Sequence, residues 1–117
     1  MITLQEVKQQ ITLDPKNWSI FLMDFVDDFR YYKNLAAIAE PFQTTDQAFD
    51  ALLASTAEYL CDELGLATPA WLAAVPGCKT PWFVSGIENL KAIALAESPL
   101  RFRIRKIFVL ANFLSRV

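Results

Sequence analysis

The chain has 117 residues, 54% of them hydrophobic and 13% aromatic, a composition that predicts one domain over residues 1–117 with its own core and excludes a disordered chain. A formal net charge of -2 provides no global attraction to nucleic acid or to an anionic membrane. The sequence contains no histidine, which excludes serine–histidine, cysteine–histidine and histidine-ligated metal mechanisms.

Capping and proline signals predict two helices before residue 41. Thr3 and Glu6 have the spacing of a capping box, so a short helix is expected to begin there and to end before Pro15. A long helix is predicted from Trp18 to just before Pro41, because apolar residues recur with a helical period. Its buried stripe comprises Phe21, Leu22, Phe25, Phe29, Tyr32, Leu35 and Ala39.

The middle of the chain predicts a third helix and an ordered loop. Capping residues at 44–46 begin the helix and Gly65 ends it as a left-handed cap. A short helix is expected after Pro69. The segment from Pro76 to Gly86 is rich in proline, glycine and aromatic residues, which is typical of a loop pinned by its side chains.

The last third predicts two further helices. One covers about 87–97, and Ser98 and Pro99 start the next. Residues 101–105 alternate like a strand, but we favour a helix, because a lone strand would have no partner. The face that this helix would bury comprises Leu100, Ile104, Ile107, Phe108, Ala111 and Leu114. The expected fold is an all-α, single-domain irregular helical bundle of about five to six helices with an ordered aromatic loop.

Two groups of residues are candidates for binding a partner. The aromatic group is an anchor of the kind that dominates protein interfaces, although it could instead fold inward and pin the loop. The basic group lies in residues 99–117, which hold five bases and no acid, although it could instead pair with the acidic residues of 44–98. The candidate binding residues are Trp71, Trp82, Phe83, Arg101 and Arg105.

A carboxylate cluster offers an alternative, metal-binding site. Asp24 and Asp28 lie one helical turn apart, and Asp62 could join them from the third helix to hold a divalent cation. A solvated acidic face is the simpler interpretation, because bundle metal sites usually add histidine. Of the two cysteines, Cys61 is expected to be buried and Cys78 to be an exposed thiol.

Several short segments between residues 57 and 117 resemble an uncharacterised family of small bacterial proteins found near toxin–antitoxin or nucleotidyltransferase genes. They are Ala57–Leu60, Pro69–Leu72, Pro81–Gly86, Glu97–Pro99, and Phe102 through Val109 to Arg116. The resemblance implies the bacterial cytosol and an accessory or antitoxin-like role, and supplies no catalytic residue.

We therefore expect a non-enzymatic, cytoplasmic helical protein that binds another protein and uses no cofactor. The net charge argues against nucleic acid as a partner, and the sequence predicts no membrane-spanning segment. Self-association into a homo-oligomer is a further possibility. The alternative is an enzyme for a small ligand, or one dependent on a divalent metal, that uses the carboxylate cluster.

Overall fold

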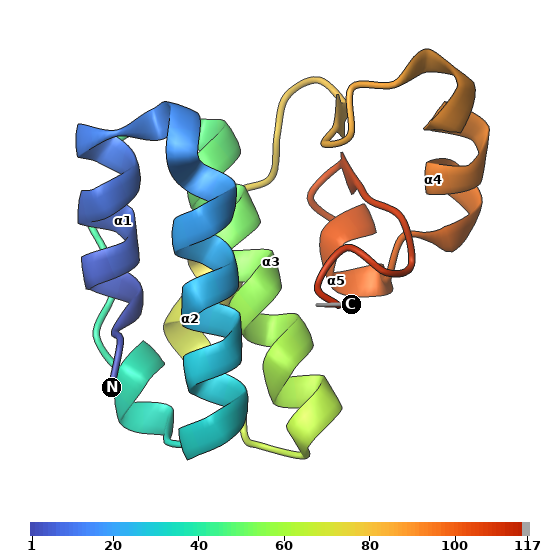
Figure 1. The fold of residues 1–117 in the computed structure, drawn as a ribbon. Coiled ribbons are helices and arrows are strands. Elements are labelled where there is room, and N and C mark those ends of the chain that lie inside the picture. The colour runs from blue at the N-terminus through green and yellow to red at the C-terminus, as the bar shows by residue number, and fades with distance from the viewer. Residues whose placement is uncertain (116–117) are drawn as a thin grey trace.

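Five α-helices and several short 3₁₀-helices make up most of the computed structural model, which describes residues 1–115 (Figure 1). Their bounds are α1 Leu4–Leu13, α2 Trp18–Tyr32, α3 Gln47–Leu64, α4 Lys91–Glu97 and α5 Leu100–Arg103. Short 3₁₀-helices lie at Pro15–Asn17, Leu35–Ile38, Ala70–Ala74 and Glu88–Leu90, and two strands lie at β1 Trp82–Phe83 and β2 Ile107–Phe108. The expected all-α fold with an ordered aromatic loop is confirmed.

The first two helices form an antiparallel pair that begins with a side-chain cap. Thr3 Oγ1 accepts a hydrogen bond from the backbone N–H of Glu6 at 3.2 Å, as the capping-box spacing predicts. The N–H of Ile2 donates to Asp28 on α2 at 2.7 Å. This bond fixes the start of α1 against the C-terminal half of α2.

The second helix is shorter than predicted. Lys33 adopts a left-handed conformation (φ 53°), and its N–H donates to Phe29 O at 2.8 Å, which ends α2 at Tyr32. Asn34 then caps the 3₁₀-helix Leu35–Ile38 by accepting from Ala36 N–H. The prediction of one helix through Ala39 is therefore wrong, and Tyr32 is exposed instead of buried.

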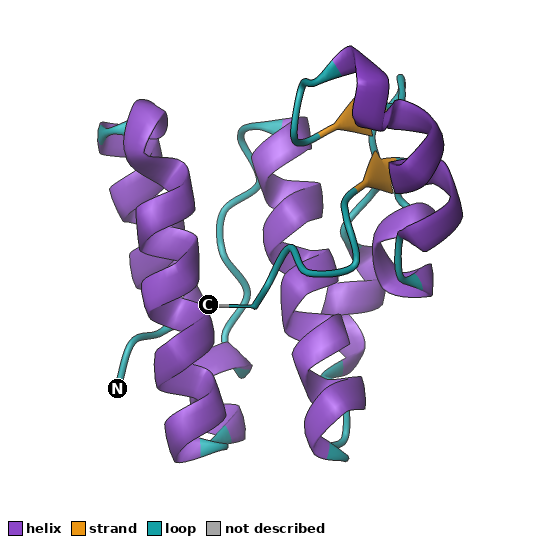
Figure 2. Cartoon of the chain, turned by 45° about the vertical axis from the view of Figure 1, so that its right-hand side comes forward, coloured by secondary structure: helices purple, strands orange, loops and turns teal. Residues whose placement is uncertain are grey.

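The third helix is buried on every side along its middle turns. Asp46 caps it by accepting from Phe49 N–H, and Gly65 ends it at φ 69°, as predicted. All residues from 51 to 58 are buried, because α1 and α2 cover one side of α3 and α5 covers another. Figure 2 shows both strands beside α4 and α5, away from α1 and α2.

The segment 101–110 departs most from expectation. Only four residues of α5 are helical, and β2 pairs in parallel with β1 in the register Trp82 with Ile107. The argument that a strand here would lack a partner is wrong, because β1 within the aromatic loop supplies one. A close approach at Gly77 supports this arrangement, since a Cβ there would lie 2.7 Å from Arg105 Cα.

Within residues 1–115, none of the helices combines the length and the apolar character that crossing a membrane requires.

Candidate functional site

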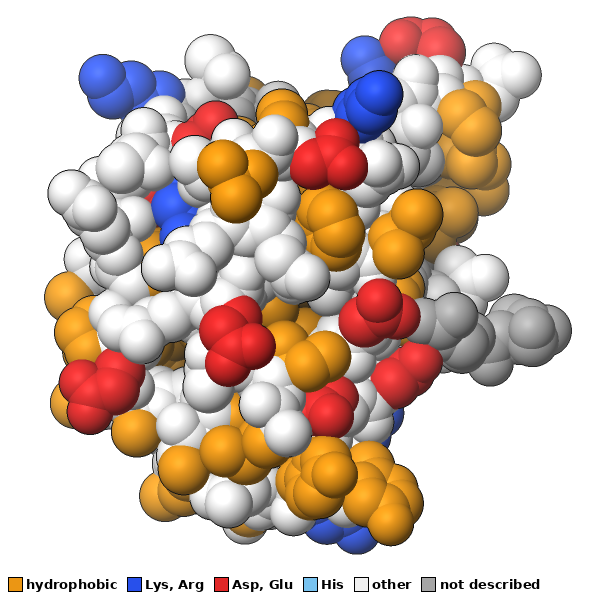
Figure 3. Space-filling view, turned by 60° about the vertical axis from the view of Figure 1, so that its left-hand side comes forward, with side chains coloured by type: hydrophobic (Ala, Val, Ile, Leu, Met, Phe, Trp, Pro, Cys, Tyr) orange, Lys and Arg blue, Asp and Glu red, His pale blue; other side chains and the backbone are white. Residues whose placement is uncertain are grey.

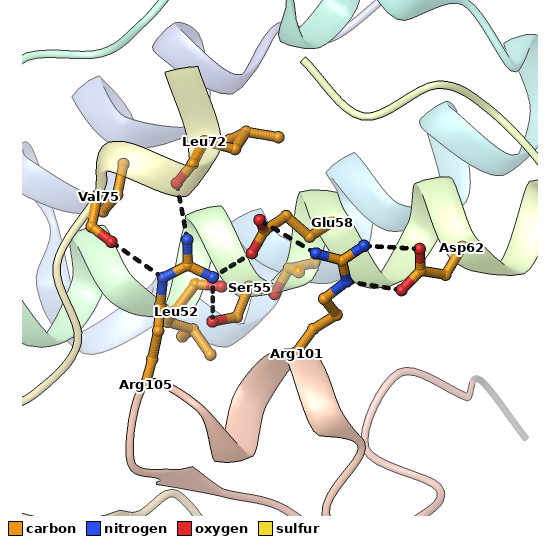
Figure 4. A network of polar contacts seen from close by, with 9 residues as sticks. Leu52, Ser55, Glu58, Asp62, Leu72, Val75, Arg101 and Arg105 are labelled. Carbon is orange, nitrogen blue, oxygen red and sulfur yellow. Dashed lines mark hydrogen bonds and ion pairs between the residues drawn. The ribbon is translucent and has the colours of Figure 1, made fainter. Parts of the chain in front are cut away.

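The Arg105 side chain lies in the interior, in the turn that follows α5. Its guanidinium forms a short ion pair with Glu58 and also donates to Ser55 Oγ at 3.3 Å. Two backbone carbonyls complete its partners, Leu72 O at 2.7 Å and Val75 O at 3.2 Å. Figure 4 shows this guanidinium reaching from the α5 side into the space between α3 and the 3₁₀-helix Ala70–Ala74. Arg105 therefore joins three elements and is not an exposed contact.

Arg101 lies one turn earlier and pairs with the same helix. Its Nε and Nη2 atoms bond both oxygens of Asp62, at 2.8 and 3.1 Å, and Nη1 lies 3.5 Å from Glu58 (Figure 4). The hydrogen bond to Asp62 raises the pKa of Arg101 above its ordinary value, and the nearby charges of Asp62 and Glu58 add to this effect. Both arginines therefore pair with acidic residues of the same chain, which is the alternative considered for the basic segment.

Trp71 folds inward. Its Nε1–H donates to Ile38 O at 2.9 Å, and its ring meets Phe42 edge to face with 5.4 Å between centroids. The ring thus ties the 3₁₀-helix Ala70–Ala74 to the segment after α2.

The aromatic residues of the loop also pack on neighbouring elements. Trp82 lies 6.1 Å from Trp18 and 5.9 Å from Phe49, measured between ring centroids. Phe83 stacks on Phe108 of the paired strand at 5.1 Å. All three predicted aromatic residues are partly buried, and Trp82 and Phe83 pin the loop through these ring contacts.

The three carboxylates proposed as metal ligands are not assembled into one site. Asp28 accepts the N–H of Ile2, and Asp62 binds Arg101. Asp24 is exposed on α2. Among the residues that the structure describes, no group of three or more Asp, Glu or Cys side chains is placed to hold a metal ion.

Both cysteines are free and buried, so the expectation of an exposed Cys78 is wrong. The N–H of Cys78 donates to Arg105 O at 2.9 Å, which draws this part of the loop under the turn after α5. Burial raises the pKa of both thiols above the ordinary value. A neighbouring lysine in the sequence is therefore no guide to the reactivity of Cys78.

We expect both thiols to react slowly with a chromogenic disulfide reagent at pH 8. Burial restricts access and a raised pKa lowers the thiolate fraction, so each rate should be at least about tenfold below that of free glutathione. After unfolding in urea both should react completely. Rapid reaction of one native thiol would show that its burial is transient.

The exposed side of α5 carries two large aliphatic residues among basic ones. Leu100 is 69% exposed and Ile104 is 59% exposed, and the i, i+4 spacing places them side by side. Arg103 and Lys106 are exposed in the same segment. Arg103 is held by two hydrogen bonds to Ser98 O, and Lys106 Nζ donates to Lys79 O. We call Leu100, Arg103, Ile104 and Lys106 the α5 surface.

The sequence predicted the opposite orientation for α5. Leu100 and Ile104 were expected to face the core, but Phe102 is the residue of α5 that does so. Ile107, which was also expected to face the core, is buried, but in β2. Arg101 and Arg105 also share an i, i+4 spacing, and the acids of α3 draw that side inward. The acids of α3 could have predicted that Arg101 and Arg105 face inward. The opposite side of α5, the α5 surface, would then have been predicted to be exposed.

Lys106 follows with a left-handed backbone (φ 60°), a conformation that favours glycine or asparagine. Its ammonium donates to Lys79 O at 3.4 Å, so the side chain lies against the loop before β1.

No family model, curated protein or solved structure matches this chain. The resemblance of residues 57–117 to small bacterial proteins therefore stays a prediction.

Proposed function

We propose that the chain is a non-enzymatic protein that binds another protein through the α5 surface. The observation that carries this proposal is the pair of exposed aliphatic residues, Leu100 and Ile104, on one helical turn with basic neighbours. Burial of both against a partner would remove apolar surface from water, which is the main driving force of association. The inward arginines support the proposal indirectly, because they hold α5 rigidly on α3.

The chemistry of the α5 surface favours an acidic, amphipathic partner segment. Its apolar side would cover Leu100 and Ile104, and its carboxylates would meet Arg103 and Lys106. Residues 99–117 contain no acidic residue, so no neighbouring carboxylate in that segment competes with a partner for Arg103 and Lys106. The absence of histidine from the sequence supports binding over catalysis. A bacterial, cytosolic, accessory or antitoxin-like role, as the resemblance implies, is part of this proposal.

Affinity capture with matched variants tests the proposal. The tagged chain, a variant with Leu100→Glu and Ile104→Glu, and a control with Tyr31→Glu are each purified from the native host. Tyr31 is 79% exposed on α2, so its variant adds a charge on another helix, outside the α5 surface. We expect a protein that copurifies with the parent and the control and is lost with the α5 variant. Equal recovery with all three chains, or recovery of nucleic acid alone, would contradict the proposal.

Once the partner is identified, we expect Arg103→Glu with Lys106→Glu to slow association by about tenfold at low ionic strength. Exposed charges act on the rate of encounter, so about 0.5 M salt should bring parent and variant close together. Stopped-flow or surface-binding kinetics measure this rate. An unchanged association rate with faster dissociation would instead place the two bases in desolvated contacts.

A further inference from the structure

A groove of about 490 Å³ lies between α1 and the loop segment 42–45. Gln5, Gln9 and Thr12 line it from α1, with the spacing of successive turns on one side of the helix. Gln43 and Thr45 line it from the loop segment. The volume falls within the range of about 300 to 1,000 Å³ that is usual for ligand pockets. Figure 3 shows the side of the molecule that carries α1, with a broad area of uncharged polar side chains and backbone.

The walls of the groove hold polar groups that other described residues leave unused. Within residues 1–115, the side chains of Gln9, Gln43 and Thr45 form no hydrogen bond, and the backbone of 43–45 forms none either. Side-chain amides and unpaired backbone groups both donate and accept hydrogen bonds, as a peptide does. These groups match the needs of a peptide backbone laid along the groove.

Lys8 is the charged group that lines this groove, and no acidic residue lines it among those described. Its side chain is only 8% exposed, and its ammonium pairs with Asp50 in a short contact. It also lies 5.9 Å from the centre of the Phe42 ring. The second oxygen of Asp50 is occupied by the N–H of Asp46 at 3.1 Å. An ammonium has three donors and Asp50 takes one, so Lys8 can donate to an anion in the groove.

We propose that this groove binds the carboxyl end of a short peptide. The peptide backbone forms hydrogen bonds with the unpaired backbone groups of 43–45. The amides of Gln9 and Gln43 bond its peptide groups, and its terminal carboxylate binds Lys8. This site lies across α3 from the α5 surface and does not depend on that surface binding a protein.

Titration with trialanine and with trialanine amide, followed by ¹H–¹⁵N NMR, tests the proposal. We expect the free acid to bind with a dissociation constant in the millimolar range and to shift signals of α1 and 42–45. The amide should bind about tenfold more weakly, because it lacks the charge-assisted bond to Lys8. Shifts elsewhere only, no shifts up to about 10 mM, or equal affinity for acid and amide would overturn it.

Two variants test the individual contacts. Gln9→Leu should weaken binding about two- to tenfold, whereas Gln10→Leu, on the same helix but outside the groove, should not. Lys8→Met with Asp50→Asn removes both buried charges and keeps an acceptor for Asp46 N–H. If it is folded by circular dichroism, it should bind acid and amide equally, and a retained preference for the acid would overturn the role of Lys8. If it does not fold, the comparison of Gln9→Leu with Gln10→Leu decides, and equal effects overturn the site.

Discussion

Replacing Glu58 with glutamine is expected to lower the free energy of unfolding by about 3 to 5 kcal/mol. Glu58 is buried on α3 and forms an ion pair with Arg105, which is also buried. The amide keeps the shape of the side chain but leaves the Arg105 charge without its counterion in the interior. Since the free energy of unfolding of a small domain is about 5 to 15 kcal/mol, this loss removes a large part of the total stability. Urea unfolding followed by circular dichroism should give a midpoint lower by at least about 1 M.

A more exposed ion pair, between Glu63 of α3 and Arg30 of α2, provides the matched control. Arg30 binds both oxygens of Glu63 at 2.8 Å, but both side chains are about one-third exposed. Glu63→Gln should therefore cost only about 0 to 1 kcal/mol. Replacing Glu58 with leucine and Arg105 with methionine together should recover part of the loss, because no unpaired charge remains. Equal midpoints for Glu58→Gln and Glu63→Gln would contradict the burial of the first pair.

Phe25→Ala is expected to destabilise the protein by about 3 to 5 kcal/mol. Phe25 is fully buried on α2 and stacks on Phe29 with 5.8 Å between ring centroids. The loss combines the transfer of the ring from water with the cavity that its removal leaves. Thermal melting and urea unfolding both measure it.

Tyr31→Ala is the control, because Tyr31 lies on the same helix and is 79% exposed. It should change stability by no more than about 0.5 kcal/mol. A folded Phe25→Ala protein with the melting temperature of the parent would show that α2 packs through another side.

The sequence alone predicted the elements whose signals are local. The caps at Thr3 and Asp46 and the left-handed Gly65 lie where their residue types indicated, since each satisfies groups within one helical turn. The burial of Phe25 and Phe29 followed from a repeated helical period.

Features that depend on distant residues could not be predicted in this way. Lys33 ends α2 in a left-handed conformation, for which lysine carries no sequence signal. β2 exists because β1, 25 positions earlier, lies beside it in parallel. The orientation of Arg101 and Arg105 depends on the acids of α3, so composition showed a basic segment but not which of its bases face outward.

The burial of α3 on several sides has a consequence for hydrogen exchange. If α1 and α2 separated from α3, α5 would still cover one side of α3. If α5 separated instead, α1 and α2 would still cover another side. The amides of the middle turns, residues 51–58, should therefore exchange with solvent only when the whole chain unfolds. The amides of α4, where only Ala94 is buried, should exchange through local opening, much faster and with little dependence on global stability.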